Sequence, residues 1–509
     1  MRRLLPYLAP WLAFAALVCF EQDYLWTAQE QSLFLHTKLF FQQSMVASGG
    51  LLSWAGAYLT QFFYYPMLGA GILCLLWAFL MLLLKQAFRL PRRWMLLTLI
   101  PVGMLLLADV QLGYWVYFLK LQGHLFVATL GFLALSLLVW AFNALPLGGA
   151  WRPLFVVAVT VVGYPLLGFY ALLAALLMAL LSWRQGRRGQ MVALVAVLSV
   201  IAVPLIAYWQ FYHQTPLHRI AFTALPVFVH NGVADAKCYL PYVVLVAWLV
   251  VAALSYHPER QEAVASRRGT WFQGFLLVAM LLCIVAGWQK DDNFHRELAM
   301  RRQMEQNDWK AMLTTIKQAK GEPTRAMSMM KNLALQHTGR LQHDMAAYPD
   351  GFCRPAAVFP IHTVHTIGKM LYLQYGIPNY CYRWCMEDGV EYGWNVEALK
   401  LMTKCSLING ETTAAQRYLS LLKRTDFHRQ WAMKYEAYLR QPSLMAQDAE
   451  FKAIAPLLRT DEFLTSDQSQ LEPFLIEHLA SAPGDTPEQR ELRAVYFRFY
   501  FNRNRYVEK

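Results

Sequence analysis

The run "PMLGAGILCLLWAFLMLLL", residues 66–84, decides the fold class, because it carries no charged side chain over the length of a membrane-spanning helix. About 20 apolar residues in a helix cross the roughly 30 Å hydrocarbon core of a bilayer. Further apolar runs fill the first 288 residues, so we expect about nine membrane-spanning helices. The other runs are 4–20, 94–109, 123–143, 153–166, 168–183, 191–209, 239–256 and 271–288.

The placement of charge predicts the orientation of the 509-residue chain, whose formal net charge is +13. With a cytoplasmic N-terminus, the cytoplasmic loops carry thirteen Lys and Arg residues and the short loops on the other side carry four. This is the bias of the positive-inside rule. We therefore expect a multi-pass protein of the bacterial inner membrane whose C-terminal domain is periplasmic. That domain, with 29 basic and 26 acidic residues, lacks the charge of a nucleic-acid-binding protein.

Residues 290–509 have the pattern of a soluble helical domain. Amphipathic segments of helix length alternate with breaks at Gly339, Gly376 and Gly410. Their spacing resembles that of tetratricopeptide-like repeats, which stack helix pairs and bind a protein or peptide on a concave face. The predicted fold class is all-α: a transmembrane domain over 1–289, followed by a helical-repeat domain over 290–509.

The segment between the first two apolar runs, residues 21–65, is the longest loop expected outside the membrane helices. It begins with "EQDYLWTAQEQSLFL", in which Glu21, Asp23 and Glu30 stand among apolar and aromatic residues. After Gly49 and Gly50 it becomes rich in Trp, Tyr and Phe, which favour the membrane interface. We expect helices lying in the interface, with the three carboxylates either as their solvated edge or as part of an active site.

The carboxylates beside the first apolar run are the candidate catalytic groups. A carboxylate that aromatic side chains partly desolvate has a raised pKa and suits a general base, and it also suits a divalent cation that steadies a phosphate leaving group. We expect Asp23 or Glu21 in one of these roles, and the spacing of His and Cys predicts no metal site. The expected substrate-binding residues are Tyr24, Asp109, Lys120, His213 and Arg219, whose basic members suit a lipid phosphate.

The chain resembles a family of uncharacterised polytopic membrane proteins of Bacteroidetes-type bacteria. The resemblance lies in "QEQSLFL" (29–35), "GGLLSWAGAYLTQFFYYP" (49–66), "NLALQHTGRL" (332–341) and "LINGE" (407–411). Residues 1–85 are more distantly similar to GT-C glycosyltransferases, in which an acidic residue and a long loop with interfacial helices follow the first helix. Those enzymes take sugars from polyprenyl-phosphate donors. Their acidic motif falls on Glu21 or Asp23 here, and Asp109 is the carboxylate available in a second outside loop.

Two functions from different classes follow. One is a GT-C-like transferase that uses a polyprenyl-phosphate-linked sugar at the periplasmic face, with membrane lipid as its partner. The alternative is a non-enzymatic membrane scaffold whose helical repeats bind a protein of the envelope. An ion-coupled carrier is disfavoured, because such carriers need charged residues inside their spans and the predicted spans contain almost none. Convergence of Asp23, Asp109 and Arg219 on one cavity would favour the transferase, and wide separation of the three would favour the scaffold.

Overall fold

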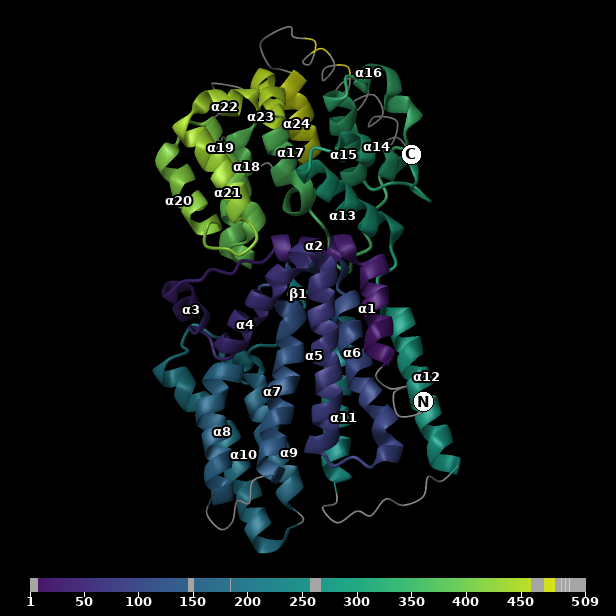
Figure 1. Cartoon of the computed structure of the whole chain (residues 1–509), viewed down its shortest axis with the longest axis vertical. Helices are drawn as coiled ribbons and strands as arrows, with labels where there is room; N and C mark the ends of the chain where they lie inside the picture. Colours follow the sequence, from purple (N-terminus) through teal and green to yellow (C-terminus); the bar gives the residue numbers. More distant parts are fainter. Residues whose placement is uncertain are drawn as a thin grey trace. The chain divides into compact units, whose positions relative to one another are not determined.

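The computed structural model describes residues 8–144, 151–183, 185–256, 267–458 and 471–480, together with Pro487, Arg490 and Ala494. These residues are almost entirely helical, apart from an antiparallel ribbon that pairs β1 (Val229–His230) with β2 (Val233–Ala234) (Figure 1). The chain divides into two compact units, each described by itself. The N-terminal unit is Met1–Trp115 with Leu119–Gln289, and the C-terminal unit is Val116–Phe118 with Lys290–Lys509.

The N-terminal unit contains a helix from each of the nine predicted apolar runs, together with three helices that lie between the first two runs. They are α1 (Leu8–Phe20), α2 (Gln22–Glu30), α3 (Lys38–Ser44), α4 (Gly50–Thr60), α5 (Pro66–Ala87), α6 (Leu99–Val110), α7 (His124–Ala144), α8 (Trp151–Leu167), α9 (Phe169–Trp183), α10 (Gly186–Gln210), α11 (Leu240–Leu254) and α12 (Arg267–Gly287). Short 3-10 segments join some of them: η2 (Gln61–Tyr64), η3 (Arg92–Thr98), η4 (Gly113–Tyr117), η5 (Leu217–Phe222) and η6 (Ala236–Tyr239).

Four helices among the described residues are long and apolar enough to cross a membrane. They are Pro66–Ala87, His124–Ala144, Gly186–Gln210 and Ala236–Leu254, and a fifth is added if α12 and the helix after it count as one span. Four further apolar helices are shorter, at 10–17 residues: Leu8–Phe20, Trp94–Val110, Trp151–Leu167 and Phe169–Trp183. Each predicted apolar run thus contains a helix, but length and composition support four or five spans rather than nine.

Glycine allows α4 to lie directly on the start of α7. Gly123 has a φ of +69°, and a Cβ atom built there would lie 2.2 Å from the backbone nitrogen of Ala57. A Cβ on Gly56 would lie 2.7 Å from the side chain of Val127. Since neither position has room for a side chain, only glycine permits this approach. Gly49, with a φ of +83°, begins α4 at the break that the sequence predicts.

Helix α2 is buried on nearly all its faces, whereas the sequence allowed its carboxylates a solvated edge. Residues from Tyr24 to Glu30 are all buried, and the helix packs against η2 and α5. Glu21, directly before the helix, is also buried. The amphipathic pattern failed here because neighbouring segments cover the polar face as well as the apolar one. By contrast, α3 has no buried residue.

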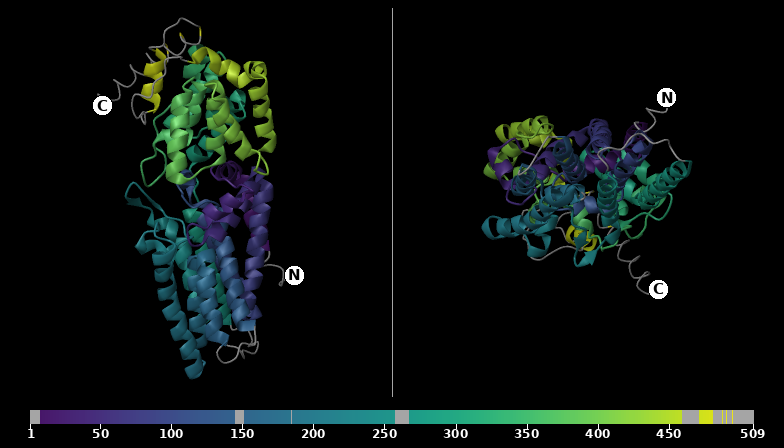
Figure 2. Two further views of the ribbon diagram at one scale, coloured as in Figure 1. Left: turned by 90° about the vertical axis from the view of Figure 1, so that its left-hand side faces the viewer. Right: turned by 90° about the horizontal axis from the view of Figure 1, so that it is seen from below.

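The C-terminal unit consists of shorter helices that pack side by side (Figure 2). They are α13 (Asp292–Glu305), α14 (Trp309–Lys317), α15 (Arg325–His337), α16 (Leu341–Asp344), α17 (Lys369–Gln374), α18 (Pro378–Tyr392), α19 (Val396–Ile408), α20 (Thr412–Leu422), α21 (Arg429–Arg440), α22 (Pro442–Gln447), α23 (Ala449–Ile454) and α24 (Leu471–Ala480). One π-helical turn, η8 (Val364–Gly368), leads into α17, and the 3-10 turns η7 (Met345–Ala347) and η9 (Ala455–Leu457) complete the unit.

The glycine breaks predicted in this unit are confirmed. Gly339, Gly376 and Gly410 have φ values of +66°, +75° and +71°, the left-handed conformation that ends helices. Successive helices pack on each other across these turns, and one continuous apolar core runs through the unit. Five of its core positions are methionines of α13 and α15: Met300, Met304, Met327, Met329 and Met330.

Candidate functional site

The acidic residue after the first apolar helix is held in place by an aromatic donor from the far end of the N-terminal unit. Glu21 is 3% exposed, and its Oε1 accepts a hydrogen bond of 2.6 Å from Nε1 of Trp288. Trp288 directly follows α12, and its ring also meets Phe20 edge-on with centroids 6.3 Å apart. The last residues of the unit thereby fix the carboxylate that follows its first helix.

Tyr24 links this acidic residue to a second one. Its hydroxyl donates a hydrogen bond of 3.1 Å to the backbone carbonyl of Asp109, at the end of α6. Tyr24 is also within electrostatic range of the carboxylates of Glu21 and Asp109, and burial raises its pKa, so the hydroxyl stays protonated as a donor. Glu21, Tyr24 and Asp109 form what we call the acid cluster.

Asp109 has hydrogen-bonding capacity that its surroundings leave unused. Its side chain is buried, and no group in the described residues donates to its Oδ2. The same holds for the hydroxyl of Tyr170 on α9. Tyr242, on α11, is within electrostatic range of both. Buried polar atoms without partners are rare in native proteins, so each such atom calls for a water, an ion or a ligand.

The remaining predicted site residues have other surroundings. Asp23 is half-buried in the first turn of α2. Lys120 and His213 are exposed, and the ring of His213 faces Tyr208 at 6.5 Å. Arg219 lies on η5, whose contacts are with α9 and α10. The structure therefore brings together Glu21, Tyr24 and Asp109, and it does not show Lys120, His213 or Arg219 joining this group.

Sequence reasoning missed the aromatic members of the site. Trp288 was counted only as the end of an apolar run, and neither Tyr170 nor Tyr242 was singled out. The one local signal is that each of these residues sits within an apolar helix or at its end, where a polar handle is unusual. Which acidic side chain each of these aromatic residues lies near is decided by the packing of the helices, and the local sequence does not show it.

A second buried polar group lies within the C-terminal unit and forms a chain of ion pairs. The guanidinium of Arg301 pairs with Glu397, whose other oxygen lies 3.5 Å from Nζ of Lys369. Lys369 pairs with Asp388 at 2.6 Å. The other carboxylate oxygen of Asp388 accepts a hydrogen bond of 2.8 Å from Nδ1 of His365. We call these five residues the ion-pair chain.

The two ends of the ion-pair chain meet adjacent residues of the segment Val116–Phe118. The ring of Tyr117 lies 5.3 Å from the guanidinium of Arg301, and the ring of Phe118 meets His365 edge-on at 5.7 Å. Burial by itself would raise the pKa of Asp388, but the charge of Lys369 lowers it below its ordinary value. The ion pairs are therefore formed at neutral pH. They add a buried polar group beside the apolar core of this unit.

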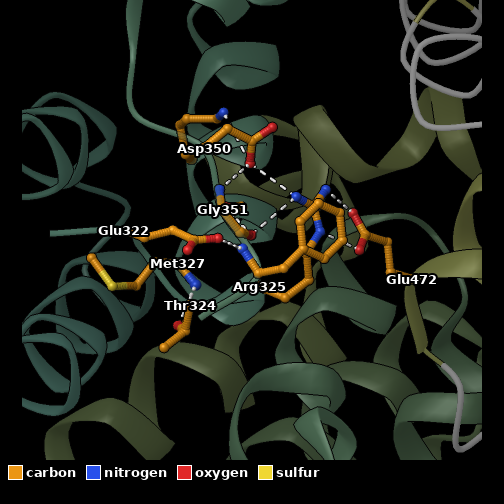
Figure 3. A network of polar contacts seen from close by, with 10 residues as sticks. Glu322, Thr324, Arg325, Met327, Asp350, Gly351 and Glu472 are labelled. Carbon is orange, nitrogen blue, oxygen red and sulfur yellow. Dashed lines mark hydrogen bonds and ion pairs between the residues drawn. The ribbon is translucent and has the colours of Figure 1, made fainter. Parts of the chain in front are cut away.

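A third polar group, drawn in Figure 3, ties α24 to the rest of the C-terminal unit. Arg325 donates to both carboxylate oxygens of Glu472 on α24 and to Oδ1 of Asp350, the latter at 2.9 Å. The ring of Phe352 covers the guanidinium at 4.6 Å. Lys331, whose side chain is fully buried, lies 3.7 Å from Oδ1 of Asp350. The two cations, Arg325 and Lys331, thus lie beside the two carboxylates of Asp350 and Glu472.

The cysteines and the other candidate ligands show no metal geometry. None of the eight cysteines forms a disulfide, and Cys381 and Cys385 lie one turn apart on α18. Burial raises the pKa of both thiols, which makes them unreactive. Across the described residues, no three His, Cys, Asp or Glu side chains are grouped so that they could hold a metal ion.

Comparison with known proteins places the whole architecture in one family. No curated protein matches the chain, and no solved structure matches it. Residues 1–487 match the model described as "Family of unknown function (DUF6057)". That match covers both units, from before α1 to beyond α24. The chain therefore belongs to this family of unknown function, DUF6057.

Proposed function

We propose that this chain is a multi-pass membrane enzyme that transfers a sugar from a polyprenyl-phosphate donor. One observation carries the proposal: Glu21, directly after α1, and Asp109, in the last turn of α6, both lie within electrostatic range of the buried hydroxyl of Tyr24, which donates to the backbone carbonyl of Asp109. The resemblance to GT-C glycosyltransferases implies an acid after the first helix and a second one in a later loop, and these two positions fit that arrangement.

The same proposal takes all nine apolar helices as spans. The four short ones become long enough when a bilayer thins or when flanking residues reach the interface, each at a modest free-energy cost. Nine spans and a cytoplasmic N-terminus would put the acid cluster near the periplasmic face, and the C-terminal unit in the periplasm. There, its helical pairs would have the tetratricopeptide-like role of receiving a protein acceptor.

The proposed reaction needs one base. The oxygen of an acceptor hydroxyl attacks the anomeric carbon of the sugar, and the bond from that carbon to the phosphate oxygen breaks. The polyprenyl phosphate leaves with the electron pair, and the base takes the hydroxyl proton. Asp109 suits this role because its Oδ2 is buried and has no hydrogen-bond partner among the described residues. Glu21, fixed by Trp288, would orient the sugar.

The test compares consumption of lipid-linked sugar in membranes of cells that express the full chain or its Asp109→Asn and Glu21→Gln variants. A lost general base lowers a rate by about 10² to 10⁴, so the total polyprenyl-linked sugar fraction, measured by mass spectrometry, should accumulate in both variants. The control is Glu387→Gln, which neutralises a carboxylate on the surface of α18. Equal consumption in all four membranes would contradict the proposal and favour the scaffold.

A further inference from the structure

Three residues between α6 and α7 belong to the C-terminal unit. They are Val116–Phe118, although Trp115 before them and Leu119 after them belong to the N-terminal unit. The backbone amide of Leu119 donates a hydrogen bond of 3.1 Å to the carbonyl of Trp115, so the chain leaves the N-terminal unit and returns to it within a single turn. All three side chains are buried. We call Val116–Phe118 the strap.

Aromatic rings of the C-terminal unit hold Phe118 of the strap. The rings of Phe359, Tyr392 and His365 meet it edge-on, with centroids 5.3, 5.4 and 5.7 Å away. This is a favourable geometry for aromatic pairs. The contact of Tyr117 with the buried guanidinium at the other end of the ion-pair chain adds a further partner. The strap is therefore gripped by side chains from separate segments of the C-terminal unit.

The residues directly before the strap are fixed within the N-terminal unit. The indole Nε1 of Trp115 donates a hydrogen bond of 3.2 Å to Oδ2 of Asp235. Nε2 of Gln111, the residue after α6, donates one of 3.1 Å to the carbonyl of Cys238. Since both side chains are tied to the same loop, the short segment between α6 and the strap has little slack.

The other connection to the C-terminal unit is attached to the same end of α6. Gln289 is the last residue of the N-terminal unit before Lys290, and its amide donates a hydrogen bond of 3.1 Å to the carbonyl of Val110. Gly113 has a φ of +53°, and a Cβ atom built there would lie 3.0 Å from Nε2 of Gln289. Both connections are therefore fixed within a few residues of Asp109.

We propose that the strap couples the C-terminal unit to the acid cluster, because the grip on Val116–Phe118 holds the last turn of α6, and with it Asp109, in one position. A weaker grip lets that turn open more often. Any change in the C-terminal unit that moves its rings away from Phe118 thereby alters the acid cluster. The inference goes beyond the proposed function, since it concerns the position of Asp109 whether or not the cluster transfers a sugar.

The experiment is hydrogen exchange of the full chain in detergent, measured at the amides of Gln111 and Trp115. Both amides are hydrogen-bonded to residues of the N-terminal unit. Tyr392→Leu and Phe359→Leu each remove one ring from the grip and leave the sequence of the strap unchanged. Loss of one edge-to-face pair should speed exchange at the two amides about fivefold.

Tyr348→Leu is the matched control. Tyr348 is also a half-buried tyrosine of the C-terminal unit, but its ring lies beside the cations of Lys317 and Arg340. This variant should leave exchange at Gln111 and Trp115 unchanged.

Two results overturn the inference. One is unchanged exchange at these amides in both Tyr392→Leu and Phe359→Leu. The other is an equal acceleration in Tyr348→Leu, which would show a general loosening of the C-terminal unit. Should neither grip variant fold, Trp115→Phe tests the coupling from the other side, because coupling between two sites is reciprocal. It removes the donor to Asp235, so the amides of η8 should exchange about threefold faster, and unchanged exchange there overturns the inference.

Discussion

The indole of Trp288 donates a hydrogen bond that helps to orient Glu21. Trp288→Phe keeps the ring beside Phe20 but removes the donor that lies 2.6 Å from the Glu21 carboxylate. If Glu21 orients the sugar, consumption of lipid-linked sugar should fall about tenfold, the effect of losing one hydrogen bond to a charged group. Trp271→Phe, at an exposed position on α12, should leave consumption unchanged. A normal rate in Trp288→Phe would remove Glu21 from the mechanism.

Glu397 has the opposite kind of role, since it stabilises the fold of the C-terminal unit. Glu397→Gln leaves Arg301 and Lys369 with one less compensating charge in a buried site. Breaking a buried pair from one side costs about 3–5 kcal/mol of unfolding free energy. Hydrogen exchange at the amides of α19 should report this loss. Glu387→Gln, which breaks an exposed pair with Arg383, should change it by less than about 1 kcal/mol.

At the scale of residues, the sequence predicted the members of the acid cluster but neither Trp288 nor the ion-pair chain. It singled out Glu21, Tyr24 and Asp109 from their position beside apolar helices, and the structure brings these three together. It did not find Trp288, because the hydrogen bond joins residues 267 positions apart and only the packed helices bring them close. Arg301, Lys369 and Asp388 gave no signal for the same reason, since a charged residue on a helix looks solvated until its neighbours are known.

Helix α24 is held to the C-terminal unit by a paired contact that a single substitution removes. Arg325→Gln would break the two hydrogen bonds to Glu472. A charge-assisted contact of this kind contributes about 2 kcal/mol, so amides of α24 should exchange roughly 30-fold faster. Arg340→Gln is the control, because Arg340 pairs with Asp344 on an exposed face. Unchanged exchange in Arg325→Gln would mean that the apolar contacts of α24 hold it alone.

The packing of α14 on α15 should depend on pH. His337, at the end of α15, stacks on Trp309 with ring centroids 4.0 Å apart, and burial lowers its pKa to about 4. Below pH 6.5 the unfolded chain takes up a proton there that the folded chain refuses. The unfolding free energy should therefore fall by up to about 1.4 kcal/mol per pH unit between pH 6.5 and 4.

Thermal unfolding of the full chain across this pH range measures the effect. His337→Phe keeps an aromatic stack on Trp309 and should reduce the slope, while His343→Gln, at an exposed position, should not. His428, which burial also keeps neutral, supplies a further part of the slope. An identical pH profile for the wild type and His337→Phe would show that His337 does not contribute.

At the scale of helices, the sequence predicted where helices end at glycines better than it predicted which helix faces are buried. The glycine turns at Gly339, Gly376 and Gly410 were correct, because a left-handed residue after a helix is a local requirement. The burial of α2 was not foreseen, since it depends on packing against η2 and α5 and on the hydrogen bond from Tyr24 to Asp109 of α6. The lengths of the short apolar helices also escaped prediction, as hydropathy alone does not say where a helix ends.

At the scale of the whole molecule, the chain consists of two compact units and belongs to one family of unknown function. The proposed transferase assigns the units different tasks. The N-terminal unit would bind the donor, with its sugar at the acid cluster, and the C-terminal unit would receive the acceptor. Neither task follows from composition, since any membrane protein with a helical domain has the same apolar and charged halves.

The most direct test of this account is mass spectrometry of the lipids released from the full chain after gentle purification. The account predicts a polyprenyl phosphate or a polyprenyl-linked sugar at about one molecule per chain. Bulk phospholipid alone would contradict the central claim that the N-terminal unit binds a lipid-linked sugar.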